Sequence, residues 1–505
     1  MDDVQLKDAS AGHVVVEEVN PAAPSSPRVL LTEEDAIQRN RCLHDCLQVL
    51  DKIVLGLSAI FGLQDDTHLT GNQYSIVGCI APAAQLAWQP FSSMLIVKIR
   101  PRILMPAMVL GWGIAQVCVP ACRNFAGLVA ARFFLGLFEA GCLPLFSILT
   151  AHWYRRSEQP ARVAVWYSTH GPATIVAALL SYGLGHAESG VLAPWQWIYL
   201  VTGLLTIVTV PLIYWRLDDD ILSARFLTAE ERSQALERLR ANQSGSASRD
   251  FKWNQVVEMF LDVKCYLFAA MSFAISLGGH VASLFGPLLL HGFGFDNYKT
   301  TLLNIPFGVL QSTVILAAAW AAGRTRWKSV PLLTLLVCIL TGFVLLYVLP
   351  RGHSHLPGLL VGYYFLAFIV GCNNTVVSWI LANTAGQTKK STMMALFNAA
   401  SSTGAIVGPL LFDSADAPEY HSGLRSTVAV YLAMIAVVLL QVGTLMVLNK
   451  LQARRRVANG KTARIHDHSM EARYVDMRMD NAETVGGRAF ADLTDRENDE
   501  FVYVY

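Results

Sequence analysis

Long apolar stretches, each followed by a short polar turn, recur along almost the whole chain. Each is about 20 residues long, the length that a helix needs to cross a bilayer core roughly 30 Å thick. A helix crosses lipid without leaving backbone groups unpaired. A weaker stretch over residues 46–63 comes first, and eleven stronger ones begin near Tyr74, Ile103, Phe125, Val163, Trp197, Cys265, Leu302, Val330, Leu359, Ser391 and Val428. The pattern predicts an all-α integral membrane protein with twelve transmembrane helices.

The composition agrees with a chain whose main partner is the lipid bilayer. Of the 505 residues, 53% are hydrophobic and only 15% are charged, whereas a soluble globular chain is usually about 25% charged. The formal net charge is +1, so the chain lacks the basic excess that nucleic-acid-binding proteins carry. We therefore expect no nucleic-acid partner.

The sequence contains no common motif of an enzyme, a metal site or a cofactor site. P-loop, GxSxG and HExxH patterns are absent, so we expect neither enzymatic activity nor transport driven by ATP on this chain. The nine cysteines form no CxxC pair and no Cys/His cluster with metal-ligand spacing. We interpret them as small apolar packing residues and predict no disulfide, metal or cofactor.

Basic residues lie mainly in alternate loops. These loops carry Lys98, Arg100, Arg102, Arg155, Arg156, Arg162, Arg324, Arg326, Lys328, Lys389 and Lys390. The positive-inside rule places the basic loops and both termini in the cytoplasm. Residues 1–41 begin with a polar segment that has no signal-peptide core, and we expect them to form a disordered cytoplasmic tail.

The longest interruption of the apolar pattern covers residues 216–263. It follows the sixth stretch and divides the chain into a six-helix N-terminal half, 42–215, and a six-helix C-terminal half, 264–450. The interruption contains amphipathic helical patterns, and we interpret it as a cytoplasmic linker. Residues 451–505 form a predicted cytoplasmic C-terminal tail.

Gly-Pro pairs in corresponding helices support this division into two halves. Gly171-Pro172 lies in the fifth stretch and Gly408-Pro409 in the eleventh, six helices later. Parallel halves related by an axis along the membrane normal are typical of twelve-helix secondary transporters. We predict gating or packing roles for these four residues.

Two ionisable residues lie at membrane depth in the fourth stretch. If its helix begins outside near Asn124, a rise of 1.5 Å per residue places Arg132 roughly 12 Å and Glu139 roughly 22 Å into the membrane. They are seven residues apart and share one helix face, with Gly136 between them as a candidate packing residue. Charges at this depth usually mark a substrate or proton path; a structural charge pair is the alternative. Arg132 is suited to bind a carboxylate, and Glu139 is suited to carry a proton.

Polar residues in other apolar stretches are candidates for the same path. Asp51 and Lys52, in the weak first stretch, are suited to pair with charges of the fourth stretch across the bundle. The candidates for proton coupling are Glu139, Asp51, Lys52 and His170. The candidates for substrate binding are Arg132, Gln85, Gln89, His280, Asn373 and Asn374. Hydrogen bonding between helices is the alternative interpretation of the uncharged ones.

Several short motifs occur together along the chain. They are Leu50–Lys52, Leu69–Tyr74, Ala131–Glu139, Trp153–Arg156, Ala224–Leu227, Glu230–Arg232, Gly292–Phe295, Leu302–Pro306, Asn383–Gly386, Thr388–Lys390, Gly408-Pro409 and Asp492–Asp495 with Glu497-Asn498. Through these motifs the chain resembles the major facilitator superfamily. Within that superfamily it resembles the fungal anion:cation symporters of the allantoate and nicotinate permease-like branch.

The resemblance implies two six-helix halves with a central cavity, alternating access, and proton-driven uptake of an organic anion. It also associates the Arg132–Gly136 pattern with proton coupling. We therefore expect a secondary transporter for a small carboxylate in the cell (plasma) membrane, acting as a monomer. Arg132 would anchor the anion, and Glu139 or Asp51 would carry the proton. An exporter of a fungal secondary metabolite working by proton antiport is the alternative, and a non-transporting membrane sensor is a third hypothesis.

Overall fold

The computed structural model describes most of the predicted helical regions. The described residues are 46–142, 145, 149, 164–165, 167–186, 192–217, 228, 232, 251–324, 327–350, 353–412, 416, 419–463 and 492–505. All regular structure within these ranges is helical. The predicted N-terminal tail 1–41, most of the predicted linker 216–263 and the basic loop with Arg155, Arg156 and Arg162 lie outside the described residues.

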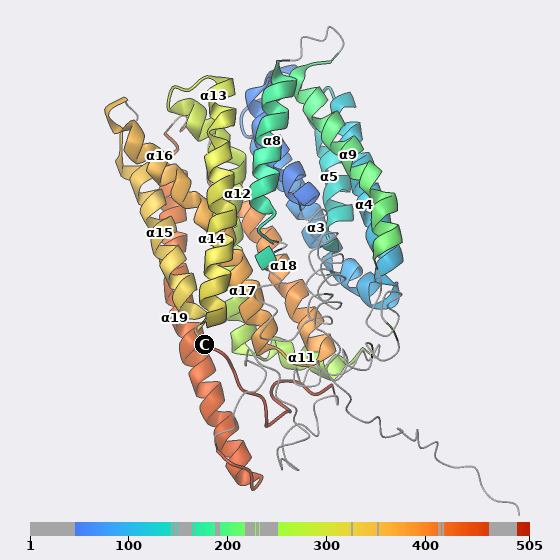
Figure 1. Cartoon of the computed structure of the whole chain (residues 1–505), viewed down its shortest axis with the longest axis vertical. Coiled ribbons are helices and arrows are strands. Elements are labelled where there is room, and N and C mark those ends of the chain that lie inside the picture. The colour runs from blue at the N-terminus through green and yellow to red at the C-terminus, as the bar shows by residue number, and fades with distance from the viewer. Residues whose placement is uncertain are drawn as a thin grey trace, which may run out of the picture.

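The helices of the N-terminal half stand side by side along a common axis (Figure 1). They are a helix over residues 46–60, α2 (Leu63–Asp66), α3 (Gln73–Lys98), α4 (Pro101–Cys118), η1 (Val119–Ala121), α5 (Phe125–Glu139), α8 (His170–Gly185) and α9 (Pro194–Arg216). Local sequence fixes several helix starts. Pro101 and Pro194 occupy the first positions of α4 and α9, where the missing N–H costs nothing. Asn124 caps α5 by accepting a hydrogen bond from the Gly127 backbone N–H at 2.8 Å.

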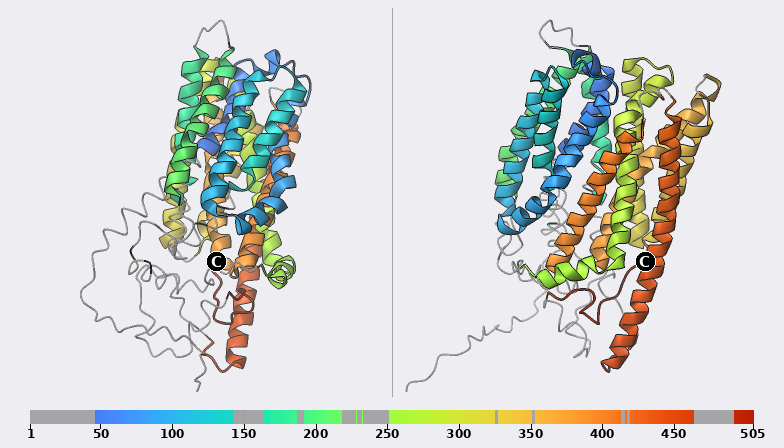
Figure 2. Two further views of the ribbon diagram at one scale, coloured as in Figure 1. Left: turned by 90° about the vertical axis from the view of Figure 1, so that its right-hand side faces the viewer. Right: turned by 180° about the vertical axis from the view of Figure 1, so that it is seen from behind.

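The C-terminal half forms a second group of helices beside the first (Figures 1 and 2). These are α12 (Val263–Gly292), α13 (Asn297–Leu302), α14 (Asn304–Arg324), α15 (Ser329–Val348), η2 (His353–His355), α16 (Leu356–Phe365), η3 (Leu366–Phe368), α17 (Ile369–Asn383), α18 (Gln387–Leu410) and α19 (His421–Ala458). A short helix from the predicted linker, α11 (Trp253–Phe260), lies across the lower ends of this half, and α19 extends below its neighbours.

The prediction of an all-α membrane protein is confirmed. The apolar stretches begin within or a few residues from helices of the structure. Eight of the described helical segments are long and apolar enough to cross a bilayer. The helix over 46–60 is shorter than the roughly 20 residues of a typical span, as its weak apolar signal predicts.

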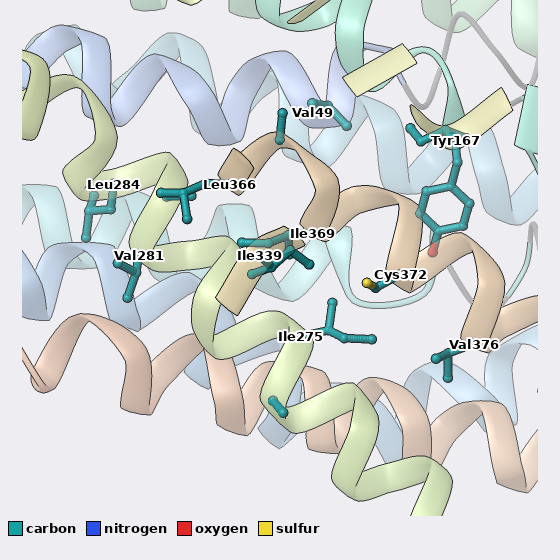
Figure 3. Close-up of a cluster of buried hydrophobic side chains, with 14 of the residues drawn as sticks. Val49, Tyr167, Ile275, Val281, Leu284, Ile339, Leu366, Ile369, Cys372 and Val376 are labelled. Carbon is teal, nitrogen blue, oxygen red and sulfur yellow. The ribbon is translucent and has the colours of Figure 1, made fainter. Parts of the chain in front are cut away.

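One hydrophobic cluster extends through both halves, and a second lies within the N-terminal half. Side chains of both halves belong to the same buried cluster, and Figure 3 shows Val49 and Tyr167 of the first half near Ile275 and Ile369 of the second. Contacts between the halves run mainly through α3 against α18 and α8 against α14. The core therefore extends across the interface between the halves.

The two ends of the bundle differ in charge and in contacts. We call the end with Lys98, Lys328 and Lys389 the basic end, and the opposite end, with Gly185 and Tyr298, the far end. At the far end the halves touch: the Tyr298 hydroxyl donates to the Gly185 carbonyl at 3.2 Å. The Tyr298 ring also stacks on the His186 ring with centroids 4.0 Å apart. These contacts hold the two halves together at the far end.

Candidate functional site

Two acids and one base are buried in the N-terminal half, and a second base, Lys52, lies beside them partly exposed. Arg132 and Glu139 on α5 are each 4% exposed, and Asp51 on the helix over 46–60 is 1% exposed. Gly136 lets α5 approach α3, because a Cβ there would collide with the Ala81 carbonyl. This close approach places Glu139 beside α3.

The Glu139 carboxylate is the centre of a network that joins three helices. Its Oε1 forms an ion pair with Lys52 Nζ at 2.8 Å and accepts from Gln48 Nε2 at 2.7 Å. Its Oε2 accepts from Gln85 Nε2 at 2.9 Å. The Lys52 side chain is 36% exposed, whereas that of Glu139 is 3% exposed. The predicted pairing of the first and fourth apolar stretches is thus formed by Lys52 and Glu139. Lys52 is the partner that is partly exposed to solvent.

Asp51 points to a different set of partners, although it adjoins Lys52 in the sequence. Its carboxylate accepts hydrogen bonds from the Trp112 indole N–H and from Gln116 Nε2, the latter at 3.0 Å. Both donors are neutral and lie one turn apart on α4. Gln116 also approaches the Thr202 hydroxyl of α9 at 3.4 Å. Asp51 therefore ties its own helix to α4 through hydrogen bonds from uncharged groups.

Arg132 retains donor capacity inside the protein. Its Nη2 donates to the Tyr199 hydroxyl at 2.6 Å, and its guanidinium carbon lies 5.6 Å from the centroid of that ring. Its buried Nε has no hydrogen-bond partner among the described residues. Because buried donors are normally satisfied, this nitrogen is the unusual feature of Arg132.

His280 brings the C-terminal half close to this group of charges. It lies on α12, where its Nδ1 is 3.2 Å from the Ser276 carbonyl, and its ring interacts electrostatically with Lys52. Among the predicted site residues, Gln85 and His280 thus join the ionisable group. Gln89 is buried one turn along α3.

The other predicted polar residues form a separate group at the interface of the two halves. Asn373 Nδ2 on α17 donates to the Tyr167 hydroxyl at 3.0 Å, and the His170 ring stacks on Tyr167 with centroids 5.5 Å apart. Asn374 is 1% exposed, and its Oδ1 has no hydrogen-bond partner among the described residues. These residues connect the halves about Tyr167.

The predicted packing residues lie where helices approach closely. A Cβ on Gly171 would collide with the Gly308 carbonyl and the Ser312 hydroxyl of α14. A Cβ on Gly408 would lie 2.6 Å from the Leu277 carbonyl of α12. The adjoining prolines differ: Pro172 is exposed and Pro409 is buried.

Four residues of the site were not predicted from the sequence: Gln48, Trp112, Gln116 and Tyr199. A signal exists for three of them. Gln48 lies four residues before Lys52, and Trp112 and Gln116 are four apart, so each pair shares a helix face. Tyr199 has no comparable pattern, because its role depends on the packing of α9 against α5.

Comparison with known proteins agrees with this architecture. The family model of the Major Facilitator Superfamily matches residues 46–409. The thiamine pathway transporter THI73 of Saccharomyces cerevisiae is 30% identical over 95% of this chain and 87% of its own length. The allantoate permease of the same yeast is 27% identical over 92% of this chain and 83% of its own length.

A solved structure shows the same fold. It is a bacterial homologue of the human lysosomal transporter Spinster in an inward-facing, unoccupied conformation. The match has a TM-score of 0.58 and 14% sequence identity, and covers 83% of this chain and 98% of that one.

Proposed function

Because this chain belongs to the major facilitator superfamily of membrane transporters, we propose that it takes up a small organic anion together with protons. The observation that carries this proposal is the buried, incompletely bonded Arg132 on the same helix as Glu139 of the Lys52–Glu139 ion pair. A relative that is an allantoate permease supports a carboxylate as substrate. As a membrane transporter the chain is not an enzyme.

Arg132 is the proposed anchor of the anion. A guanidinium binds a carboxylate through two parallel N–H···O bonds, and such charge-assisted bonds are stronger than neutral ones. Tyr199 holds the guanidinium in place through Nη2, which leaves Nε for a substrate oxygen. The polar side chains Gln85 and His280 are suited to contact the rest of the substrate.

Charge balance provides the coupling to protons. Arg132 and Lys52 are basic and Asp51 and Glu139 are acidic, so the site contains equal numbers of basic and acidic side chains. An entering carboxylate adds one negative charge in a region where unbalanced charge is costly. Protonation of Glu139 offsets this charge and frees Lys52 to face the anion. Anion and proton therefore bind most favourably together, which is the basis of symport.

Alternating access would follow from rocking of the two halves. The far-end contacts about Tyr298 belong to a state closed on that side, and they must separate when the site opens there. The glycine contacts between α8 and α14 allow backbones to slide with little side-chain obstruction. We propose the cell membrane as the location, with both termini in the cytoplasm and the basic end on that side, and a monomer as the working unit.

Uptake of radiolabelled allantoate and nicotinate by cells that express this chain tests the proposal. We expect uptake that rises as the external pH is lowered and collapses when a protonophore is added. Uptake that ignores both treatments would contradict proton coupling. If protein confirmed at the cell surface takes up no tested carboxylate, the proposal of anion uptake fails and export becomes the direction to test.

A further inference from the structure

Residues 492–505, which we call the strap, lie against the basic end of the C-terminal half. The strap is the dark red segment that passes beneath the helices toward the end marked C in Figures 1 and 2. Thr494 and Asp495 are 0% exposed and Tyr503 is 2% exposed. A segment buried to this extent is part of the packed structure.

Asp495 of the strap lies between two buried lysines of the membrane helices. It forms ion pairs with Lys264 of α12 and with Lys389 of α18, the latter at 2.9 Å. Both lysine side chains are 0% exposed. The remaining acids of this cluster are Asp262, which lies 3.4 Å from Lys264 and 3.2 Å from Lys389, and Glu258, which lies 2.7 Å from Lys389.

The charge of Asp495 is strongly favoured in this position. Burial alone would raise the pKa of Asp495, but the Lys264 and Lys389 ammonium groups outweigh burial and hold the pKa of that carboxyl well below its usual range. Without the strap, Lys264 would keep Asp262, and Lys389 would keep Asp262 and Glu258. Removing one partner of a buried ion pair is strongly destabilising.

The last residues of the strap bond to side chains of α17 and α19 through their backbone. The Val504 N–H donates to Asn383 Oδ1 at 2.8 Å, and the Val504 carbonyl accepts from the Trp379 indole N–H at 2.8 Å. Tyr503 exchanges two such bonds with the Asn449 amide, each 2.9 Å long. Bonds of this kind require an extended segment in one register.

The first residues of the strap bind α11, the helix that enters the C-terminal half from the linker. Asp492 pairs with Lys252 at 2.9 Å, and its carbonyl accepts from Gln255 Nε2 at 2.9 Å. The Thr494 hydroxyl donates to Glu258 at 2.7 Å. Asp492 Oδ1 also accepts from the Gln387 N–H at the start of α18, at 2.8 Å. The strap therefore bridges α11 and the membrane helices.

We infer that the strap is a permanently docked element of the C-terminal half with two roles. It supplies the counter-ion for the buried lysines Lys264 and Lys389. It also fastens α11 to this half, so that the end of the linker moves together with the C-terminal half as one body. This inference does not depend on the substrate or on proton coupling.

Truncation after Ala491 tests the inference, with a synthetic peptide of residues 492–505 supplied in trans. We expect the purified truncated protein to melt at least about 5 °C lower than the full chain, because buried charge loses its partner. The peptide should restore most of that difference, and its Asp495→Asn version should not. Equal melting of the truncated and full-length proteins would overturn the inference.

Full-length variants keep the test decisive if the truncated chain does not fold. Asp495→Asn should lower the melting temperature, and the double variant Lys264→Met/Asp495→Asn should recover at least half of the loss, because the unpaired lysine is gone. Glu419→Gln is the matched control: it changes an acid to an amide in an ion pair whose side chains are 51% and 55% exposed, so melting should not change. A double variant as unstable as the sum of its parts would refute the counter-ion role.

Hydrogen–deuterium exchange tests the second role. In the full chain, amides of α11 should exchange slowly, and in the truncated chain or in Asp492→Ala they should exchange at least about ten times faster. Exchange in α9, which belongs to the N-terminal half, should stay the same. Unchanged exchange in α11 would show that α11 is held without the strap.

Discussion

The molecule contains two buried groups of acids and bases that are bonded very differently. In the N-terminal half, the Lys52 side chain is 36% exposed and pairs with Glu139, while Arg132 Nε has no hydrogen-bond partner among the described residues. At the basic end of the C-terminal half, Lys264 and Lys389 are fully buried, and each contacts Asp262 and Asp495. We therefore expect the first group to be able to exchange a partner for a substrate, whereas exchange in the second would leave buried charges without partners.

The difference shows that buried charged residues can serve either transport or the stability of the fold, depending on how they are bonded. Buried ion pairs lose hydration that only well-placed partners replace. A charged group that has an unpaired donor and one partly exposed residue can bind an additional anion at a low cost in free energy. A group in which every charge has several partners resists rearrangement. Variants in the first group should therefore change transport, and variants in the second should change stability.

The largest expected effect is that of Arg132→Ala on uptake. Loss of a charged contact should reduce carboxylate uptake at least about tenfold, since a hydrogen bond to a charged group contributes about 1.5–3 kcal/mol. Surface expression and melting temperature should change little. Uptake assays at equal surface abundance measure this effect, and retention of uptake would remove Arg132 from the site.

Lys389→Met is the corresponding change in the second group. It leaves Asp262, Asp495 and Glu258 with fewer partners, so we expect a loss of about 3–5 kcal/mol in stability and a reduced amount of protein at the membrane. Thermal unfolding in detergent with the unmodified chain as reference measures the change. A normally stable Lys389→Met protein with lost uptake would reverse the assignment of the two groups.

Glu139→Gln should separate anion binding from proton coupling. The amide keeps the size of the side chain but binds no proton, so Lys52 remains available for the anion. We expect the rise of uptake at acidic external pH to disappear, a change of about tenfold per pH unit at most for one proton. Unaltered pH dependence in this variant would point to Asp51, and Asp51→Asn would then be the next variant to assay.

The smallest effect concerns the pH dependence of the second group. The pKa of Asp495 is lower in the folded protein than its ordinary value of 3.8, so its contribution to stability is present above that value and is lost as the pH falls below it. The contribution of Asp495 to the melting temperature should therefore stay constant between pH 5 and 8. A comparison of the wild type with Asp495→Asn across this range checks it, since the difference between them should stay constant.

Much of the fold is predictable from the sequence because the bilayer imposes a fixed span length. The positions of the helices, and the depth of Arg132 and Glu139, follow from apolar length and helical rise. The choice of Lys52 as the partner of Glu139, with Asp51 turned to Trp112 and Gln116, depends on how the first helix is rotated. Adjacent residues in the sequence cannot reveal that rotation.

The strap shows the limit of prediction from sequence more clearly. Residues 492–505 are mostly polar and follow the last apolar stretch. The sequence places them in a cytoplasmic tail and marks Asp492–Asp495 as part of a family motif, but it does not predict that they pack against the membrane helices. Their partners, such as Lys264 and Asn383, lie more than one hundred residues away. Contacts at such separation leave no local periodicity. The alternation of Phe501 and Tyr503, both buried, is the one local sign of a packed segment.

The most direct test of the account is the proton stoichiometry of anion binding. Calorimetric titration of the purified protein with allantoate, repeated in buffers of different ionisation enthalpy, measures how many protons are bound with each anion. We expect uptake of about one proton per carboxylate by the wild type, little or none by Glu139→Gln, and no binding by Arg132→Ala. Binding of allantoate by the wild type without proton uptake would contradict the charge-balance mechanism.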